Sequence, residues 1–162
     1  MTRWHCSHVL RSFVVLCHLT TLVAIESSAA DIDPMDWPSW RGPHQNGVSY
    51  EVGLIEELDP KGGEGSNVLW KSRDAAGIST PIVMNGRLFT IVRDSPNTPK
   101  DAEKVVCLDA LTGEKKWESI YNVFLSDVPA ERVGWSHVTG DPSTNRVYAL
   151  GACCLFQCFN AE

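Results

Sequence analysis

Four cysteines in the second half of the chain are the residues whose type and spacing most directly suggest chemistry. Cys153 and Cys154 are adjacent, Cys158 follows four residues later, and Cys107 stands apart. Cys154 and Cys158 have a spacing that zinc ligands use, but no matching Cys/His pair occurs elsewhere in the sequence. We therefore expect no metal site, and we interpret the cysteines as buried thiols or as a bridge that involves Cys158.

A second group of polar and aromatic side chains precedes these cysteines. Asp127, Glu131 and Arg132 lie in one polar segment, and Trp135 and His137 follow it. Loops on a rigid scaffold often carry binding residues, so this segment is a candidate ligand surface. A solvated connector with an Arg–carboxylate contact is the interpretation that we favour. His137 has no second histidine and no matched carboxylate beside it, so we expect no acid–base catalysis there.

The composition argues against two classes of function. The chain carries 20 acidic and 14 basic residues, for a formal charge of −6, and its adjacent pair Lys115-Lys116 is flanked by Glu114 and Glu118. Nucleic-acid binding needs clustered Lys and Arg, so we expect no nucleic-acid partner. The sequence also has no GxSxG motif, phosphate-binding loop or metalloprotease helix motif.

The first thirty residues have the pattern of a signal peptide. Arg3 and Arg11 precede an apolar run over residues 13–25, and the small residues at 28–30 would allow cleavage before Asp31. The run is about thirteen residues long, too short to span a bilayer comfortably. We expect export to the periplasm or the extracellular space, with no membrane span after cleavage; a membrane anchor is the alternative.

The elements that must position the candidate residues are predicted to be strands throughout. Residues 31–67 are rich in Pro, Gly and aromatic residues, which predicts an irregular arm and loop. No later stretch shows sustained helical periodicity, and Asn85-Gly86 is a strong hairpin signal between two β-rich runs. The expected strands cover residues 68–70, 80–84, 87–92, 104–108, 116–120 and 146–150.

A turn between two of these strands has a structural use for each of its residues. Asp109 can accept hydrogen bonds from backbone N–H groups of the turn, and Thr112 can add a hydroxyl contact. Gly113 supplies the positive φ that closes a hairpin with a bulge. Trp117, on the returning strand, can pack against a neighbouring sheet while its indole N–H finds a partner. We interpret this stretch as an architectural turn.

The second half of the chain repeats the first. Residues 77–79 match residues 134–136 at an offset of 57, and residues 107–110 match residues 158–161 at an offset of 51. Residues 85–89 match 144–148, and Trp70 and Trp117 fall at comparable places 47 residues apart. The matches keep their order, which predicts one four-stranded unit, most of a second, and the last strand of an earlier one.

The motif Leu108-Asp109-Ala110-Leu111-Thr112-Gly113, with Trp117 four residues later, resembles the tryptophan-docking repeat of pyrroloquinoline quinone-like (PQQ-like) β-propellers. The opening stretch DWPSWRGP, residues 36–43, resembles the start of exported planctomycete proteins of this family. The resemblance implies four-stranded antiparallel blades, with a blade at about 77–120 and a partial blade at about 134–162 of an incomplete propeller over 68–162. Closed propellers need four to eight blades, so we expect a truncated N-terminal fragment.

The same resemblance implies three functions. The first is an exported, non-catalytic binding or assembly scaffold with a protein partner or a small ligand. The second is part of a PQQ-dependent quinoprotein dehydrogenase that uses Ca²⁺, in which Cys153 and Cys154, with Arg132 and Trp135, are the candidate cofactor contacts. The third is the sensor domain of a larger enzyme such as a kinase. We favour the scaffold, because the repeat motif is specific for a fold and not for a reaction.

Overall fold

The computed structural model describes Asp33, residues 36–123 and residues 129–162. The predicted signal segment, residues 1–30, and the candidate Asp127 lie outside the described residues. Within them the regular structure is β, apart from two short 3-10 turns, η1 (Ala130–Arg132) and η2 (Ala152–Cys154). The predicted all-β class is confirmed. No helix in the described ranges has the length and apolar character needed to cross a membrane.

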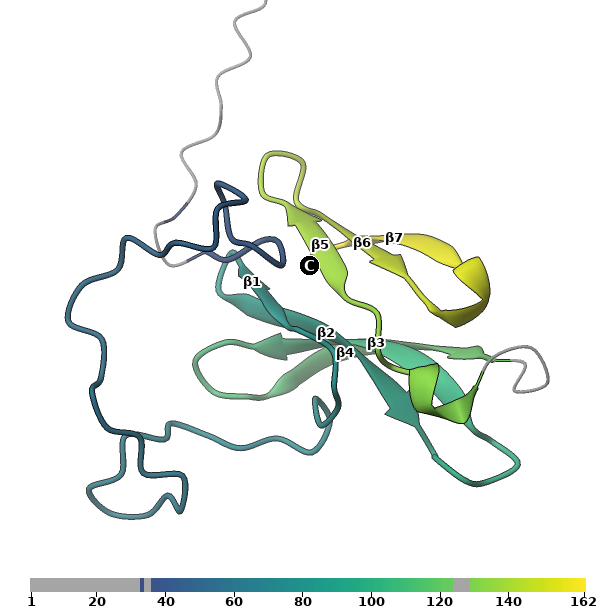
Figure 1. Ribbon diagram of the computed structural model, residues 1–162, viewed down its shortest axis with the longest axis horizontal. Helices are drawn as coiled ribbons and strands as arrows, with labels where there is room; N and C mark the ends of the chain where they lie inside the picture. The colour runs from purple at the N-terminus through teal and green to yellow at the C-terminus, as the bar shows by residue number, and fades with distance from the viewer. Residues whose placement is uncertain (1–32, 34–35, 124–128) are drawn as a thin grey trace, which may run out of the picture.

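The first sheet is a four-stranded antiparallel meander with the order β1-β2-β3-β4 (Figure 1). The Asn85-Gly86 turn joins β1 to β2 with φ values of 53° and 71°, the left-handed geometry of a tight hairpin. The strands on either side of the 95–101 loop run further than the sequence predicted, because the ladder between them continues as far as Asp94 and Ala102. The four strands are β1 (Ile82–Met84), β2 (Arg87–Asp94), β3 (Ala102–Asp109) and β4 (Lys115–Asn122).

The second sheet has three antiparallel strands in the order β5-β6-β7. They are β5 (Val138–Asp141), β6 (Arg146–Leu150) and β7 (Phe156–Asn160). The strand pairing of this sheet parallels that of the first. Phe89 pairs with Cys107 and Ile91 pairs with Val105 in the first sheet. The equivalent pairs of the second sheet are Tyr148 with Cys158 and Leu150 with Phe156.

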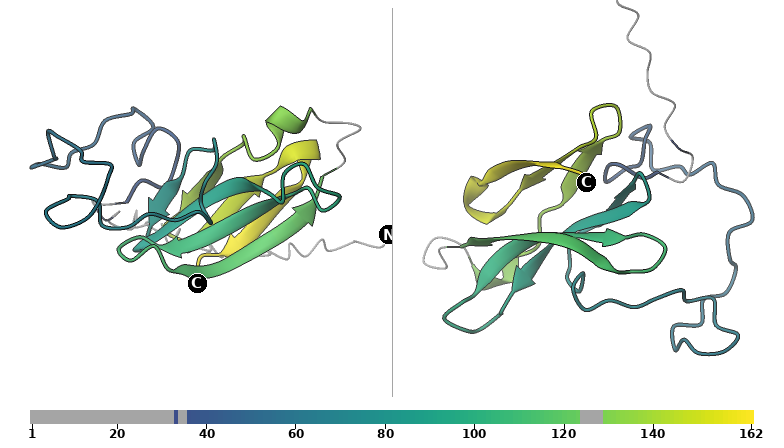
Figure 2. Two further views of the ribbon diagram at one scale, coloured as in Figure 1. Left: turned by 90° about the horizontal axis from the view of Figure 1, so that it is seen from below. Right: turned by 180° about the vertical axis from the view of Figure 1, so that it is seen from behind.

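The core lies between the two sheets, which Figure 2 shows as stacked layers. It is built by alternate strand residues, since side chains of successive residues point to opposite faces of a sheet. The first sheet contributes one face, including Phe89, Ile91 and Val105, and the second contributes Val147 and Ala149, all with no exposed surface. Burial of a side chain of this size contributes about 1.5–3 kcal/mol, so this layer is the main source of stability.

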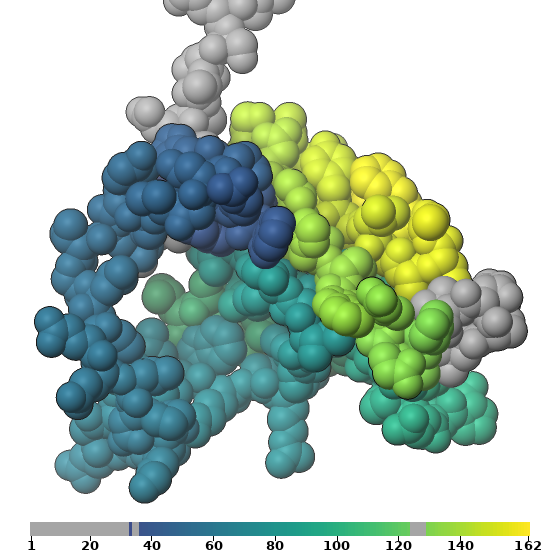
Figure 3. Space-filling model, viewed as in Figure 1, coloured from purple at the N-terminus to yellow at the C-terminus, as the bar shows by residue number. Residues whose placement is uncertain are grey.

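The segment before the first sheet contacts it at its start and again from Trp70 onward, and between these contacts it extends away from the sheet, as the blue segment of Figure 3 shows. Trp37 forms an isolated antiparallel bridge with Val83, which adds the arm to the free edge of β1. The prediction of a strand at residues 68–70 is wrong. These residues pair with no strand of the described chain, and Leu69 is 80% exposed. Trp70 instead uses its side chain to contact the first sheet.

Candidate functional site

The turn between β3 and β4 has the geometry that its sequence predicts. The Asp109 carboxylate accepts hydrogen bonds from the N–H groups of Leu111 and Thr112, at 3.1 and 2.9 Å. The Thr112 hydroxyl accepts a bond from the N–H of Glu114, and Gly113 has a φ of 72°. Hydrogen bonds from Thr112 hold the pKa of Asp109 below its usual range. The expected bulge follows Cys107, where the register shifts.

Trp70 docks onto this turn from 40 residues away in the sequence. Its indole N–H donates a 3.0 Å hydrogen bond to the carbonyl oxygen of Ala110. A Cβ atom at Gly113 would lie 2.5 Å from the Trp70 ring, so glycine is needed both for the positive φ and for the close approach of the ring. The turn is therefore a receptor for a distant tryptophan, and its residues have structural roles.

The second sheet repeats part of this arrangement. In the first sheet the N–H of Ala110 donates to the carbonyl of Gly86 at 3.0 Å, and in the second the N–H of Ala161 donates to that of Asn145 at the same distance. Trp117, the counterpart of Trp70, stacks on Phe159 with ring centroids 5.4 Å apart. Its packing against the neighbouring sheet is confirmed.

One detail of the Trp117 prediction is wrong. We expected the indole N–H to find a partner, but the buried Nε1 atom has no hydrogen-bond acceptor among the described residues. Stacking on Phe159 and a 5.9 Å contact with Phe89 fix the ring inside the core between the sheets. Apolar packing, and not a hydrogen bond, therefore holds this second tryptophan.

A buried carboxylate joins the two halves of the molecule, and the sequence reasoning missed it. Glu103, on β3, has no exposed surface. Its Oε1 accepts a 2.6 Å bond from the N–H of Gly134, while Oε2 accepts bonds from the Tyr121 hydroxyl at 2.6 Å and the Ala152 N–H at 2.7 Å. These three bonds compensate for the loss of hydration that burial of a carboxylate entails. Burial and the contact with Glu103 raise the pKa of Tyr121.

Glu103 also brings two of the predicted sites, the segment with Trp135 and the turn with Cys153, to one end of the sheets. Gly134 directly precedes Trp135, and Ala152 directly precedes Cys153, so one carboxylate is bonded to the backbone beside both. The alternation of side chains along a strand could have identified Glu103 as buried, since it lies on the same face of β3 as the apolar Val105 and Cys107.

The connector before β5 forms a shallow hollow of about 200 Å³. Glu131, Arg93 and Gly134 are among its lining residues. Arg93 forms a two-point ion pair with Asp101, one of whose hydrogen bonds measures 2.8 Å, and this contact holds the pKa of Asp101 below its usual range.

With the carboxylates that the structure describes, Arg132 does not make the Arg–carboxylate contact expected of the connector. Its guanidinium carbon instead lies 4.4 Å from the centroid of the Trp135 ring, a cation–π contact. Among the carboxylates that the structure describes, none forms an ion pair with Arg132. Arg132 and Trp135, two of the candidate cofactor-binding residues, thus contact each other.

His137 lines a second and larger hollow of about 400 Å³ on the second sheet. Its ring centroid is 6.3 Å from that of Trp40 in the arm. The neighbouring Ser136 has a buried hydroxyl oxygen with no hydrogen-bond partner in the described residues. The remaining lining residues are Thr139, Tyr148, Leu150 and Phe156. The floor of this hollow is apolar and aromatic.

The four cysteines that the structure describes are free, and one of these four is buried. Cys107 lies in the core, where burial raises the pKa of its thiol. The interpretation of the others as buried thiols or as a bridge with Cys158 is wrong. Strand alternation turns Cys158 outward on β7, and the turn after β6 exposes Cys153 and Cys154. Both residues of that turn have positive φ, 58° and 60°.

No protein-family model matches this chain, and no curated protein matches its sequence.

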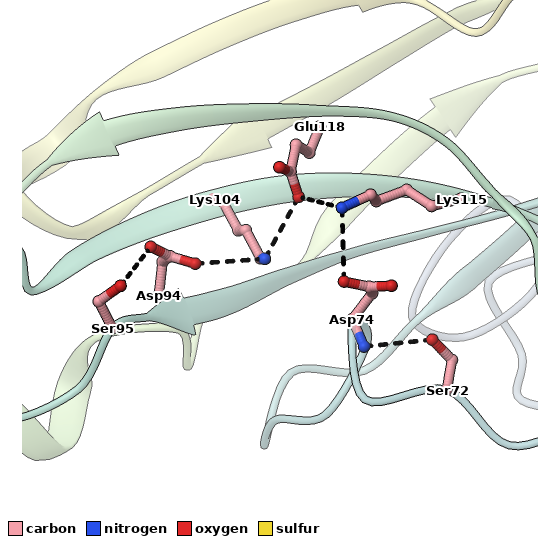
Figure 4. Close-up of polar contacts among 7 residues, drawn as sticks. All are labelled: Ser72, Asp74, Asp94, Ser95, Lys104, Lys115 and Glu118. Atoms are coloured by element: carbon pink, nitrogen blue, oxygen red, sulfur yellow. Dashed lines mark hydrogen bonds and ion pairs between the residues drawn. The ribbon is translucent and has the colours of Figure 1, made fainter.

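The remaining polar cluster lies on the opposite face of the first sheet (Figure 4). Lys104 contacts Asp94 and Glu118 at 3.2 and 3.3 Å, and Lys115 contacts Glu118 and Asp74 at 3.1 and 3.5 Å. The two lysines hold the pKa of Glu118 below its usual range. The cluster fastens the chain segment that contains Asp74 to β3 and β4, which is a structural role.

The polar side chains Glu103, Arg93 and Arg132 are all engaged in contacts within the chain. No group of three or more His, Cys, Asp or Glu side chains in the described ranges is placed to hold a metal ion. Calcium takes six to eight oxygen ligands, so these residues do not fit the Ca²⁺ that a quinoprotein dehydrogenase would need. The hollow beside His137 has an exposed aromatic and aliphatic lining.

Proposed function

We propose that this chain is part of an exported, non-catalytic scaffold of the PQQ-like β-propeller type, in which each sheet is one blade. The observation that carries the proposal is the docking of Trp70 onto the turn at residues 109–113, with an indole hydrogen bond to Ala110 and a glycine beneath the ring. Trp70 fastens the segment before the first sheet to the turn of that sheet, which is the kind of contact that would hold successive repeats together.

The contacts of Arg132 and of the buried Glu103 support a scaffold over a catalyst. Arg132 is engaged with Trp135, and Glu103 accepts hydrogen bonds from three donors of the chain itself. A general acid or base must instead reach a substrate proton. The hollow beside His137 has an aromatic and aliphatic floor, which suits a partner that buries apolar surface.

One observation favours the alternative of a quinoprotein dehydrogenase. Cys153 and Cys154 are adjacent, exposed and both in the left-handed region, so the turn holds two thiols side by side in a sterically unfavourable conformation. Backbone strain of this kind often marks a functional site. We assign no oxidation step to it, because the described residues do not fit Ca²⁺.

A cofactor titration tests the scaffold against this alternative. The purified protein is mixed with PQQ and Ca²⁺, and binding is followed by equilibrium dialysis and by alcohol-dependent dye reduction. We expect neither stoichiometric binding nor reduction, and the Cys153→Ser/Cys154→Ser variant to behave as the parent. Stoichiometric PQQ binding with alcohol-dependent turnover that the double variant loses would replace the scaffold with the dehydrogenase.

Export is tested separately. The full chain is expressed in a bacterium, and the N-terminal residue of the periplasmic product is determined. We expect Asp31, because Ser28-Ala29-Ala30 provides the small residues that signal peptidase needs. A product that keeps Met1 and stays in the cytoplasm would contradict the proposal.

A further inference from the structure

The turn between β6 and β7 carries two adjacent thiols. Cys153 and Cys154 are both free and exposed. In Figure 1 the turn is drawn as a short coil at the tip of the yellow hairpin, so it lies at the end of the second sheet and not on one of its faces. The core between the sheets is built by other residues, and the packing of the fold therefore gives these two thiols no role.

The backbone directs both cysteine side chains to one side of the turn. Cys153 has a φ of 58° and a ψ of 23°, and Cys154 has a φ of 60°, so both have the left-handed helical conformation. Successive residues of a helical backbone are rotated by roughly 100° about its axis, whereas those of a strand point to opposite faces. Adjacent cysteines in a strand would point away from each other, but this turn can present both sulfur atoms to one bound atom.

Hydrogen bonds on both sides of the pair fix the turn. The N–H of Gly151 donates to the carbonyl oxygen of Leu155 at 2.9 Å, which closes the hairpin around the two cysteines. The N–H of Ala152 donates to the buried carboxylate of Glu103 at 2.7 Å, which ties the turn to the first sheet. A site that is held in place before its ligand arrives loses less conformational entropy on binding.

The two sulfur atoms restrict the class of ligand. Thiolates bind soft, thiophilic centres in preference to Mg²⁺ or Ca²⁺. Zinc takes at least three protein ligands, and no group of three His, Cys, Asp or Glu side chains within the described ranges is placed to hold a metal ion. Two thiols by themselves suit a centre that accepts two sulfur ligands, as arsenic does in a monosubstituted trivalent arsenical.

We propose that Cys153 and Cys154 form a dithiol site for a monosubstituted trivalent arsenical. Two As–O bonds of the hydrated form, R–As(OH)₂, break and two As–S bonds form, and the two thiol protons leave with the oxygen atoms as two water molecules. Arsenic stays trivalent, so the step needs neither an oxidant nor a reductant. Cys158 is exposed but stands alone on β7, so it can supply only one As–S bond. The dithiol site does not depend on the proposed scaffold function.

Titration of the reduced full chain with phenylarsine oxide tests the dithiol site. Excess 2-mercaptoethanol is kept in the solution, because a monothiol displaces arsenic held by one sulfur more readily than arsenic held by two. We expect one bound arsenic per chain. Cys153→Ser and Cys154→Ser should each raise the dissociation constant by roughly a hundredfold or more, since the second sulfur no longer binds within the same molecule. The matched control, Cys158→Ser, removes another free and exposed thiol and should bind as the parent does.

Mass spectrometry of a tryptic digest locates the bound arsenic. Cys153 and Cys154 lie in the fragment 147–162, whereas Cys6, Cys17 and Cys107 lie in other fragments. We expect the mass of the arsenical on the fragment 147–162 of the parent and of Cys158→Ser. Arsenic on another fragment, or binding that Cys158→Ser loses and Cys153→Ser keeps, would overturn the assignment.

Urea unfolding with and without phenylarsine oxide separates a preformed site from two neighbouring thiols in any chain. The unfolded chain also offers adjacent thiols, so the midpoint rises only if the turn binds the arsenical more tightly in the folded state. We expect a higher midpoint for the parent and for Cys158→Ser, and no change for Cys153→Ser. An unchanged midpoint for the parent would overturn the preformed site. None of these outcomes bears on PQQ-dependent turnover, by which the scaffold is tested.

Discussion

The two sheets of this protein come from one repeated pattern and differ in how much of each is covered. The first sheet has the second packed on one face, and on the other it has the segment that Asp74 and its ion pairs fasten to it. The second sheet shares the inner layer but leaves Leu150 and Phe156 exposed on its outer face. The difference shows that the contribution of equivalent residues to stability depends on what packs against them, and not on their place in the repeat.

The two tryptophans illustrate the same difference at single residues. Trp70 is only partly buried, yet it is fixed by a hydrogen bond to Ala110 and by contact with Gly113. Trp117 packs on Phe159 in the core and has no hydrogen-bond acceptor among the described residues. One position is specified by polar geometry and the other by apolar packing.

The largest effect should come from removing the carboxylate that joins the two halves. Glu103→Leu would leave the donors on Gly134, Ala152 and Tyr121 buried without acceptors. At about 1–3 kcal/mol for each unsatisfied group, we expect a loss of roughly 3 kcal/mol or more of unfolding free energy, measured by urea denaturation. Tyr121→Phe removes one donor together with its need for an acceptor, and should cost much less. Equal losses in the two variants would mean that Glu103 does not join the halves.

Equivalent aliphatic positions in the two sheets give the next effect. Ile91→Ala removes a fully buried side chain and should cost about 2–5 kcal/mol, whereas Leu150→Ala removes one that is half exposed and should cost less than about 1 kcal/mol. Both are measured by denaturation at a concentration where the chain is monomeric. Similar costs for the pair would show that the outer face of the second sheet is covered in the monomer.

Two glycines of the first sheet separate backbone conformation from the docking of Trp70. Gly86 and Gly113 have nearly the same φ, 71° and 72°, but an added Cβ would meet nothing within 4 Å at Gly86 and would strike the Trp70 ring at Gly113. Gly86→Ala should cost about 1–2 kcal/mol, the penalty for a left-handed alanine, and Gly113→Ala should cost more. The fluorescence of Trp70 should shift only in the second variant; a shift in both would weaken the docking assignment.

The smallest effect concerns the acid sensitivity of the turns. Hydrogen bonds lower the pKa of Asp109 in the first sheet and of Asp141 in the second. A lowered pKa stabilises the fold above the unfolded-state value of about 4, and this contribution is lost as the pH falls through the folded-state pKa. The Asp109→Asn and Asp141→Asn variants should therefore lose less stability than the parent between about pH 4 and pH 2. A parallel pH dependence in all three proteins would count against the turn contacts.

Much of the fold could be predicted from local pattern. Asn85-Gly86 determines a hairpin through its backbone preferences, and the residues 109–113 contain the acceptor, the hydroxyl and the glycine that their turn uses. The repeat offsets anticipate the strand pairing of the second sheet, because pairing register follows sequence spacing. The sequence pattern at residues 68–70 was misleading, since a strand exists only where another strand offers a partner for its hydrogen bonds.

The sequence by itself determined the all-β class, the turns and the repeat, since these depend on residues close together in the chain. Only the tertiary structure decided that Glu103 is the junction between the halves, that Arg132 binds Trp135, and that Cys153 and Cys154 are exposed. The Glu103 junction depends on which segments meet across the two sheets, whereas the Arg132–Trp135 contact spans three residues of one connector. Contacts between residues 30 to 50 positions apart follow from sheet packing, which one strand's pattern does not encode.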